Sequence, residues 1–450
     1  MSSVDTKTPG ALKRSVKLLT LSACMYVAYA ACIGSPVTMK FFLHLGANDL
    51  HIALLGGLPT VMLSMFFAGA LLANRLTRRK PAFFWLFIPS RLLYLPVAFI
   101  PLIFPDAPTD WVLGAIIVMI SVHWALSNTG ETLFQSWLAD LIPHRILNRY
   151  LGGRQVWMSL TSVASLLAIS AFVYLSDQPV TVKFPILVTV GVAMGLADIL
   201  LFLGIREPPH IAVRDRHPLS LLIEPIRHRD YRTFLRFMCV WRVGLLLIGA
   251  FAYYYMLKVL HVRLVHLILL QCLLLGVRAA SAKTWGRLAD KHGHRPILTI
   301  CVALKPIYAM SFFVMTPDNA VWVLLPIMML DGVVNSGLSV ATEGYSMKMA
   351  PKENRSMFLA AASGLTGICA GSAAIAAGVL LKGLGDWTID LYGRTWTKYH
   401  LVFGASLIIR IGCVFLIRTV REPGRSRARG MLADVFGRSQ EDPPPLPPGY

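Results

Sequence analysis

Long apolar runs recur from one end of this chain to the other, and no other feature constrains its fold as strongly. A helix crosses a bilayer with about 20 mostly apolar residues, and in hydrocarbon only helices or closed barrels satisfy every backbone hydrogen bond. Barrel strands would instead alternate apolar and polar residues over segments of about ten. The chain is 56% hydrophobic and 15% charged, whereas soluble domains carry about a quarter charged residues. The sequence therefore predicts an all-α membrane protein with many spans.

The runs predict twelve transmembrane helices. The first begins near Val16 and is too long for the apolar core of a signal peptide, so we interpret it as an uncleaved span. The predicted spans are 16–42, 50–74, 82–104, 110–140, 154–176, 183–205, 235–257, 264–285, 296–315, 320–347, 356–382 and 400–420.

The net charge of +20 is concentrated in alternate loops rather than along one stripe. Lys and Arg gather in the loops after even-numbered spans, in the interval 206–234 and near both ends of the chain. Cytoplasmic loops of membrane proteins carry this excess of cations. The pattern predicts that both termini lie in the cytoplasm. It argues against a nucleic-acid partner. The short loops and the absence of transit features favour a multi-pass protein of the cell membrane, inner or plasma.

Two segments of the chain repeat. The stretch "GRLADKHGHRP" at 286–296 is echoed by "ALLANRLTRRK" at 70–80, and "FLGIREPP" after the sixth span is echoed by "IRTVREPG" after the twelfth. Such parallel duplication is an architecture of secondary transporters. The predicted division is an N-tail at 1–15, a six-helix bundle at 16–205, a cytoplasmic linker at 206–234, a second bundle at 235–420 and a basic, Pro-rich disordered tail at 421–450.

The stretch at 286–296 resembles the loop signature of the major facilitator superfamily, G-x-L-A-D-R/K-x-G-x-R, which joins the second and third spans of each half. In the first half this motif is degraded, because Ala70, Asn74 and Thr77 replace the first Gly, the Asp and the second Gly. The motif, the repeat and the topology together cover about residues 12–423. The resemblance implies a twelve-helix transporter fold and solute transport by alternating access.

The resemblance also implies a cytoplasmic gate at this loop. Its two glycines allow a tight turn and close helix approach, and its charges form a relay with adjacent helix ends. We expect Asp140 to partner Arg78 or Arg79, and Lys348 to pair with Asp290. The alternative is that these cations only set topology. The expected gate residues are Gly286, Asp290, Lys291, Gly293, Arg295, Asn74, Arg75, Arg78, Arg79, Asp140 and Lys348.

Charged residues inside the spans mark the candidate transport site. A charge at the bilayer centre costs about 2.5–3.5 kcal/mol on insertion scales, so such residues usually face the protein interior. The resemblance implies that spans one, four, seven and ten line a central cavity. The candidates for substrate or proton binding are Glu131, Asp331, His123, Glu343, Arg278 and Arg242.

His123 and Glu131 lie about two helical turns apart and so share a helix face. His123 occupies the repeat position of Asp331, which suggests a proton-coupling pair across the pseudo-twofold axis. The alternative for His123 is a satisfied interior histidine, and for Glu343 a place in the cytoplasmic gate.

Arg242 and Arg278 are the candidate anion-binding residues, because a guanidinium matches a carboxylate or phosphate bidentately. Arg242 has an alternative role in snorkelling to lipid headgroups. We interpret four other intramembrane charges as structural pairs or anchors between peripheral helices: Arg91, Lys305, Asp198 and Arg410. The small residues "GICAGSAAIAAG" at 367–378 predict close packing of the eleventh span.

No nucleotide-binding GxxxxGK[ST] motif, metal-ligand cluster or nucleophile–base constellation is present in the sequence. We therefore expect no enzyme, no catalytic residues, no metal and no cofactor. The predicted function is a proton-coupled permease, a symporter or antiporter, that moves a small anionic or zwitterionic solute and works as a monomer in the lipid bilayer. The alternatives are a non-transporting sensor or scaffold on the same fold, and a membrane enzyme acting on lipid.

Overall fold

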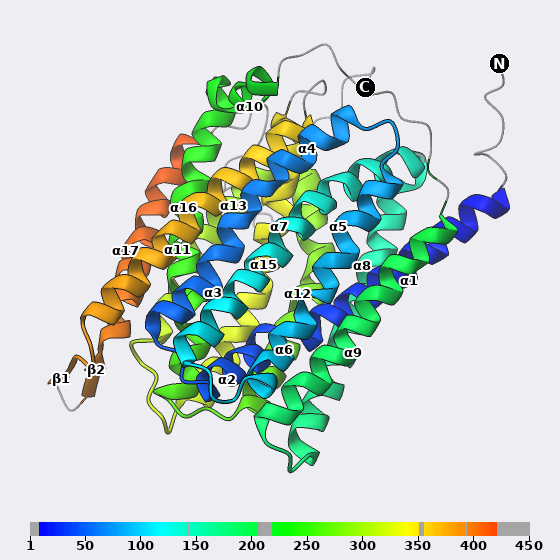
Figure 1. Ribbon diagram of the computed structural model, residues 1–450. Helices are drawn as coiled ribbons and strands as arrows, with labels where there is room; N and C mark the ends of the chain where they lie inside the picture. The colour runs from blue at the N-terminus through cyan, green and yellow to red at the C-terminus, as the bar shows by residue number, and fades with distance from the viewer. Residues whose placement is uncertain are drawn as a thin grey trace, which may run out of the picture.

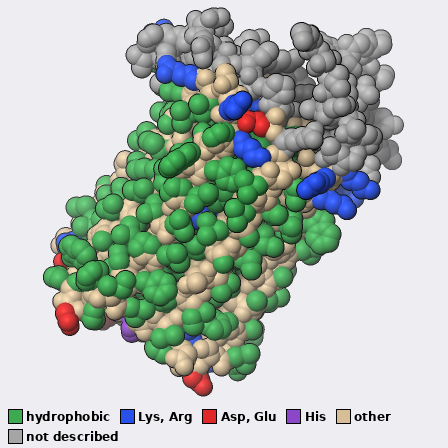
Figure 2. All heavy atoms as spheres, turned by 45° about the vertical axis from the view of Figure 1, so that its right-hand side comes forward, with side chains coloured by type: hydrophobic (Ala, Val, Ile, Leu, Met, Phe, Trp, Pro, Cys, Tyr) green, Lys and Arg blue, Asp and Glu red, His purple; other side chains and the backbone are tan. Residues whose placement is uncertain are grey.

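A computed structural model describes residues 9–142, 144–205, 207, 218–350, 355–391 and 394–420. Long helices run side by side between two ends of the molecule (Figure 1). One end carries helix α10 (Pro218–Arg227), and we call it the α10 face. The opposite end carries strands β1 (Thr388–Leu391) and β2 (Arg394–Thr397), and we call it the hairpin face. Hydrophobic side chains cover the middle of the visible surface, whereas Lys and Arg gather towards the α10 face (Figure 2).

In the first half, three spans are broken into two helical segments each, and three are continuous. Ile33 and Gly34 separate α1 from α2, a 3-10 turn at Met62–Ser64 follows Pro59 and separates α3 from α4, and Leu93 separates α5 from α6. The helices are α1 (Pro9–Cys32), α2 (Ser35–His44), α3 (Asp49–Val61), α4 (Met65–Arg75), α5 (Lys80–Leu92), α6 (Tyr94–Ile103), α7 (Thr109–Leu141), α8 (His144–Leu175) and α9 (Val180–Leu201), with a final 3-10 turn at Phe202–Gly204.

The second half follows the linker helix α10. Its helices are α11 (Arg229–Lys258), α12 (Leu264–His292), α13 (His294–Leu304), α14 (Pro306–Ser311), α15 (Ala320–Met349), α16 (Arg355–Gly383) and α17 (Lys398–Leu416), with a final 3-10 turn at Ile417–Thr419. Helix α11 begins at Arg229, inside the predicted linker, because the His228 side chain accepts a hydrogen bond from the Tyr231 backbone N–H and caps the helix there.

The predicted fold, an all-α membrane protein with two six-helix repeats, is confirmed. Within the described residues, eleven helical segments are long and apolar enough to cross a membrane. The predicted ninth span corresponds to α13 and α14, which are separated at Lys305 because Pro306 cannot continue the hydrogen-bond ladder. Each of these two helices is too short to cross a membrane alone.

One element differs from the all-helical prediction. Strands β1 and β2 form an antiparallel hairpin between α16 and α17, with Thr388 opposite Thr397 and Leu391 opposite Arg394. The β-branched and aromatic residues of "TIDL" and "RTWT" favour strand over helix.

The two bundles meet where α3 and α4 pack against α16, where α2 and α3 pack against α11, and where α8 packs against α12. A Cβ atom at Gly371 would lie 2.5 Å from the Gly57 carbonyl oxygen, and one at Gly378 would lie 2.0 Å from the Ala53 Cβ. The predicted close packing of the eleventh span is therefore confirmed, and its partner is the second span. At the hairpin face, Lys398 Nζ of α17 lies 2.5 Å from Asp49 Oδ2 of α3, and the Tyr399 hydroxyl donates to Asp49 Oδ1 at 2.6 Å. These contacts join the bundles at that face.

Candidate functional site

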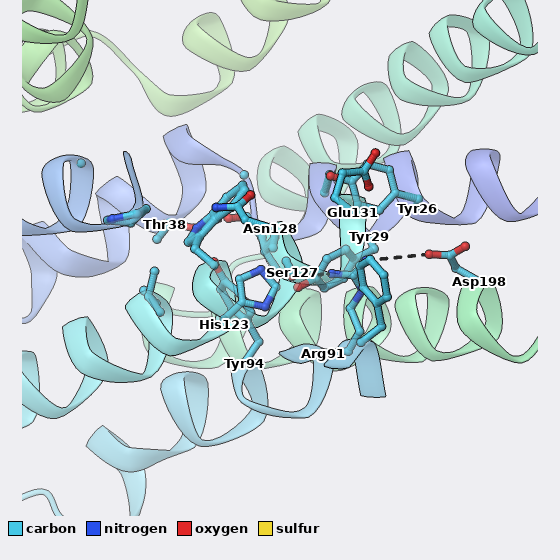
Figure 3. A pocket seen from close by; sticks show the side chains of 18 of the residues that line it. Tyr26, Tyr29, Thr38, Arg91, Tyr94, His123, Ser127, Asn128, Glu131 and Asp198 are labelled. Carbon is cyan, nitrogen blue, oxygen red and sulfur yellow. Dashed lines mark hydrogen bonds and ion pairs between the residues drawn. The ribbon is translucent and has the colours of Figure 1, made fainter. Parts of the chain in front are cut away.

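A cavity of about 940 Å³ lies between the two bundles. It reaches from Thr38 and Ile52, towards the hairpin face, to Arg154 and Glu343, nearer the α10 face. Most of its charged and hydrogen-bonding side chains come from the first bundle (Figure 3). The second bundle contributes Leu246, Gly249, Ala250, Tyr253, Gln271 and Glu343.

Arg91 and Asp198 form an ion pair in the wall of this cavity. Arg91 lies in the last turn of α5 and Asp198 lies on α9, and their Nη2 and Oδ2 atoms are 3.8 Å apart (Figure 3). The other carboxylate oxygen of Asp198 accepts a short hydrogen bond from the Ser22 hydroxyl on α1. Arg91 Nη1 lies 3.4 Å from Ser127 Oγ on α7. The pair therefore joins four helices of the first bundle at membrane depth.

Aromatic rings surround the Arg91 guanidinium. Its carbon lies 4.5 Å from the ring centre of Tyr29, 5.4 Å from that of Tyr26 and 5.3 Å from that of Phe87. Cation–π attraction of this kind gains strength where the cation is removed from water. The rings hold the guanidinium in one place.

His123 and Glu131 both line the cavity from α7, as their shared helix face predicts. His123 Nδ1 lies 2.7 Å from the Ser90 carbonyl oxygen, so Nδ1 carries the hydrogen. Its ring packs against Tyr29, Tyr94 and Trp124. Glu131 Oε1 accepts a hydrogen bond from Gln135 at 3.1 Å.

Glu343 and Arg278, from α15 and α12, are brought together through a third side chain. Arg278 Nη2 donates to Ser339 Oγ at 3.2 Å, and Ser339 Oγ donates to Glu343 Oε1 at 3.2 Å. Glu343 lines the cavity. Arg242 is exposed on α11 and is not among the described residues that line the cavity.

Asp331 is buried in the second bundle and is not among the described cavity-lining residues. Its Oδ1 lies 2.6 Å from Lys305 Nζ, and its Oδ2 accepts from Asn335 Nδ2 at 2.8 Å. His123 and Asp331 therefore have separate partners in this structure, because Asp331 contacts Lys305 and His123 Nδ1 contacts the Ser90 carbonyl oxygen. Their joint role in proton coupling stays a prediction. The break between α13 and α14 places Lys305 opposite α15, which explains this pairing.

The motif loop lies at the α10 face. Gly293 has φ +89°, a left-handed value that favours glycine, and it alone separates α12 from α13. The expected tight turn is confirmed there. Gly286 shows no close helix approach, because a Cβ atom at that position would meet nothing within 4 Å. The degraded first copy has a longer connection, from Arg75 at the end of α4 to Lys80 at the start of α5.

Other gate residues differ in their surroundings. Arg79 is buried, its Nη1 donates to Ser136 Oγ of α7 at 2.7 Å, and its backbone N–H donates to Glu207. Arg295 Nη2 donates to the Arg418 carbonyl at 3.3 Å. The side chains of Asn74 and Asp140 lie outside the described residues. The remaining gate side chains are exposed: Arg75, Arg78, Asp290, Lys291 and Lys348.

Sequence reasoning missed Arg91 and Asp198 as cavity residues. Both are intramembrane charges, but the family resemblance placed the third and sixth spans at the periphery. The sequence did contain a signal. Arg91 on the third span and Asp198 on the sixth span have opposite charges within one bundle, and such a pair can form in the wall of a cavity. The tyrosines Tyr26 and Tyr29 on the first span gave no comparable signal.

Comparison with known proteins identifies the architecture. Residues 268–440 match the family model of the Major Facilitator Superfamily. A crystal structure of the D-xylose-proton symporter has a TM-score of 0.67 at 14% identity, with 93% of this chain and 100% of that chain covered. A mutant of the nucleoside transporter NupG has a TM-score of 0.66 at 13% identity, covering 91% and 100%. The xylose transporter XylE from E. coli, in a partially occluded inward open conformation, has a TM-score of 0.62 at 13% identity, covering 93% and 99%. A search among curated proteins finds no match to the sequence.

Proposed function

We propose, from the premise that this chain is a member of the major facilitator superfamily, that it moves a small solute across a membrane by alternating access. The observation that carries the proposal is the cavity of about 940 Å³ between the bundles, where charged and aromatic side chains lie at membrane depth. Small-molecule sites have volumes of about 300–1,000 Å³. The solute therefore has the size of a metabolite rather than of a polymer.

The α10 face is cytoplasmic in this proposal. Cytoplasmic loops carry an excess of Lys and Arg, and these side chains gather towards that face in Figure 2. The bundles are joined at the hairpin face by Asp49, Lys398 and Tyr399. The cavity extends towards Arg154 and Glu343 at the other end. These observations support an inward-facing conformation with its outer gate closed.

Glu131 is the proposed proton-coupling residue. Its carboxylate lines the cavity and accepts a hydrogen bond from the neutral Gln135 amide, with no cation within ion-pair distance among the described residues. A carboxylate without a bound counter-ion in a low-dielectric site gains or loses a proton as its surroundings change. Such a group links proton movement to the exchange between inward and outward conformations.

Transport in proteoliposomes tests the proposal. The purified chain is reconstituted and uptake of labelled uridine, xylose, L-phenylalanine and 3-phenylpropanoate is followed with and without an imposed proton gradient. We expect saturable uptake of at least one solute and its concentration inside vesicles by an inward proton gradient. The absence of flux and binding for every solute would contradict the proposal and favour a sensor or scaffold on this fold.

A further inference from the structure

The Arg91 guanidinium is buried, charged and incompletely hydrogen-bonded. Its side chain is 3% exposed. Nε has no hydrogen-bond partner, Nη1 has one long contact at 3.4 Å, and Nη2 is 3.8 Å from Asp198, beyond hydrogen-bond length. Leaving a charged donor unsatisfied in a buried site carries a large desolvation cost. The protein alone does not complete the coordination of this group.

Arg410 offers a comparison within the same molecule. It is also buried, at 1% exposure, but its Nε donates to the Gly244 carbonyl at 3.2 Å and its Nη1 to the Lys305 carbonyl at 3.3 Å. Arg410 is not among the described residues that line the cavity. Arg410 therefore donates hydrogen bonds to backbone carbonyl groups. Arg91 lines the cavity, and its Nε has no hydrogen-bond acceptor.

The surroundings of Arg91 suit an incoming anion. Arg91, Ser127 and Asp198 all line the cavity, and Tyr26 and Tyr29 hold the guanidinium in position (Figure 3). A guanidinium binds a carboxylate through two parallel hydrogen bonds, and these charge-assisted bonds are roughly twice as strong as neutral ones. Asp198 makes no such bidentate contact, because its Oδ2 is 3.8 Å from Arg91 Nη2, while its Oδ1 accepts a hydrogen bond from Ser22.

We propose that Arg91 is the receptor for a carboxylate group on the transported solute, and that this carboxylate displaces Asp198 from the guanidinium. Asp198 then keeps the hydrogen bond from Ser22. The inference rests on the proposed transport function and adds the chemical class of the solute. Glu131 lies one helical turn beyond Ser127 on α7, within reach of an ammonium group on the same solute. Amino acids and simple carboxylic acids are therefore the two sources of the carboxylate.

Matched probes that differ only at the carboxylate test this assignment. Binding to the purified full-length chain is measured by calorimetry for 3-phenylpropanoate against 3-phenylpropanamide, and for L-phenylalanine against L-phenylalaninamide, with acetate, uridine and xylose as further probes. We expect the acids to bind at least about tenfold more tightly than their amides. A preference for L-phenylalanine over 3-phenylpropanoate identifies an amino acid, and the reverse identifies a simple acid.

Two substitutions that should change carboxylate affinity in opposite directions test whether Arg91 binds the solute or only stabilises the fold. Arg91→Gln removes the preference for the acid over its amide. Asp198→Asn removes the competing anion, so carboxylate affinity rises, whereas a merely structural ion pair would lose affinity in both variants. Arg410→Gln is the control and keeps the preference for the acid. If Arg91→Gln does not fold, the carboxylate affinities of Arg91→Lys and Asp198→Asn still distinguish a carboxylate receptor from a merely structural ion pair.

The results also distinguish this inference from the transport proposal. If amides bind as well as acids, if no carboxylate binds, or if Asp198→Asn weakens carboxylate binding, the inference is overturned. Binding and flux of uridine or xylose would then leave the transport function standing. If no probe binds and no probe is transported, the transport function itself fails.

Discussion

Glu131 lies in the cavity wall and accepts a hydrogen bond from Gln135 rather than from a cation. We expect Glu131→Gln to abolish concentration of solute by a proton gradient, because the amide cannot exchange a proton. Exchange of a solute without an ammonium group, such as 3-phenylpropanoate, should continue in the absence of a gradient, because the cavity keeps its shape. Gradient-driven uptake and counterflow in the same vesicles measure the two properties.

The control for this variant is Asp177→Asn. Asp177 is exposed in the connection between α8 and α9, and its substitution should leave both activities unchanged. Equal loss of uptake and counterflow in Glu131→Gln would contradict a coupling role and indicate damage to solute binding.

Asp331 contacts Lys305 at 2.6 Å in the interior of the second bundle. We expect Asp331→Asn to lower the free energy of unfolding by about 3–5 kcal/mol, because it leaves a buried ammonium without a counter-charge. Thermal unfolding in detergent measures this loss. The double variant Lys305→Met with Asp331→Leu removes both charges and should recover most of the stability. Normal stability of Asp331→Asn with loss of solute binding would instead return Asp331 to the transport site.

At the scale of single elements, α16 packs against α3 through glycines with no space for a side chain. A Cβ atom at Gly371 would lie 2.5 Å from a carbonyl oxygen of α3, whereas one at Gly383 on the same helix would meet nothing within 4 Å. We expect Gly371→Ala to destabilise the protein by about 1–3 kcal/mol, the usual cost of overpacking. Gly383→Ala is the matched control and should unfold at the wild-type temperature. Equal unfolding temperatures for both variants would show that the contact between α3 and α16 relaxes freely.

At the scale of the whole molecule, the pair of Asp49 and Lys398 connects the two bundles at the hairpin face. Both side chains are about nine-tenths buried, and Lys398 Nζ also donates to the Gly385 carbonyl at 2.6 Å. Removing one partner of a buried pair costs about 3–5 kcal/mol. We expect Lys398→Met to shift the protein towards conformations in which this face is open.

Spin labels at Asp106→Cys and Ile389→Cys, one on each bundle at the hairpin face, measure that shift in a background without the native cysteines. The distance between labels should lengthen in Lys398→Met and return towards the starting value in the charge swap of Asp49→Lys with Lys398→Asp. An unchanged distance in Lys398→Met would mean that the other contacts between the bundles, such as the glycine contacts of α16 and the packing of α2 and α3 against α11, hold this face closed.

The sequence by itself determined the class of fold and most of its helices. Continuous apolar runs leave a chain only helical solutions in hydrocarbon, so the predicted spans agree with the helices from α1 to α17. The left-handed turn at Gly293 was also readable, because its motif calls for a residue without a Cβ atom between two helices. The hairpin of β1 and β2 was not predicted, since two short strands give little periodic signal.

Only the tertiary structure decided which intramembrane charges share a site. The sequence places four charged residues inside apolar spans: Arg91, Asp198, Lys305 and Asp331. Their spacing along the chain does not show which of them line the cavity. Packing puts Asp331 against Lys305 and puts Arg91 in the cavity beside Asp198 with donors unused. The cost of burying a charge favours an interior position for each of these four side chains. The distances between helices, which the sequence does not encode locally, determine whether such a side chain forms a fixed pair or an open binding position.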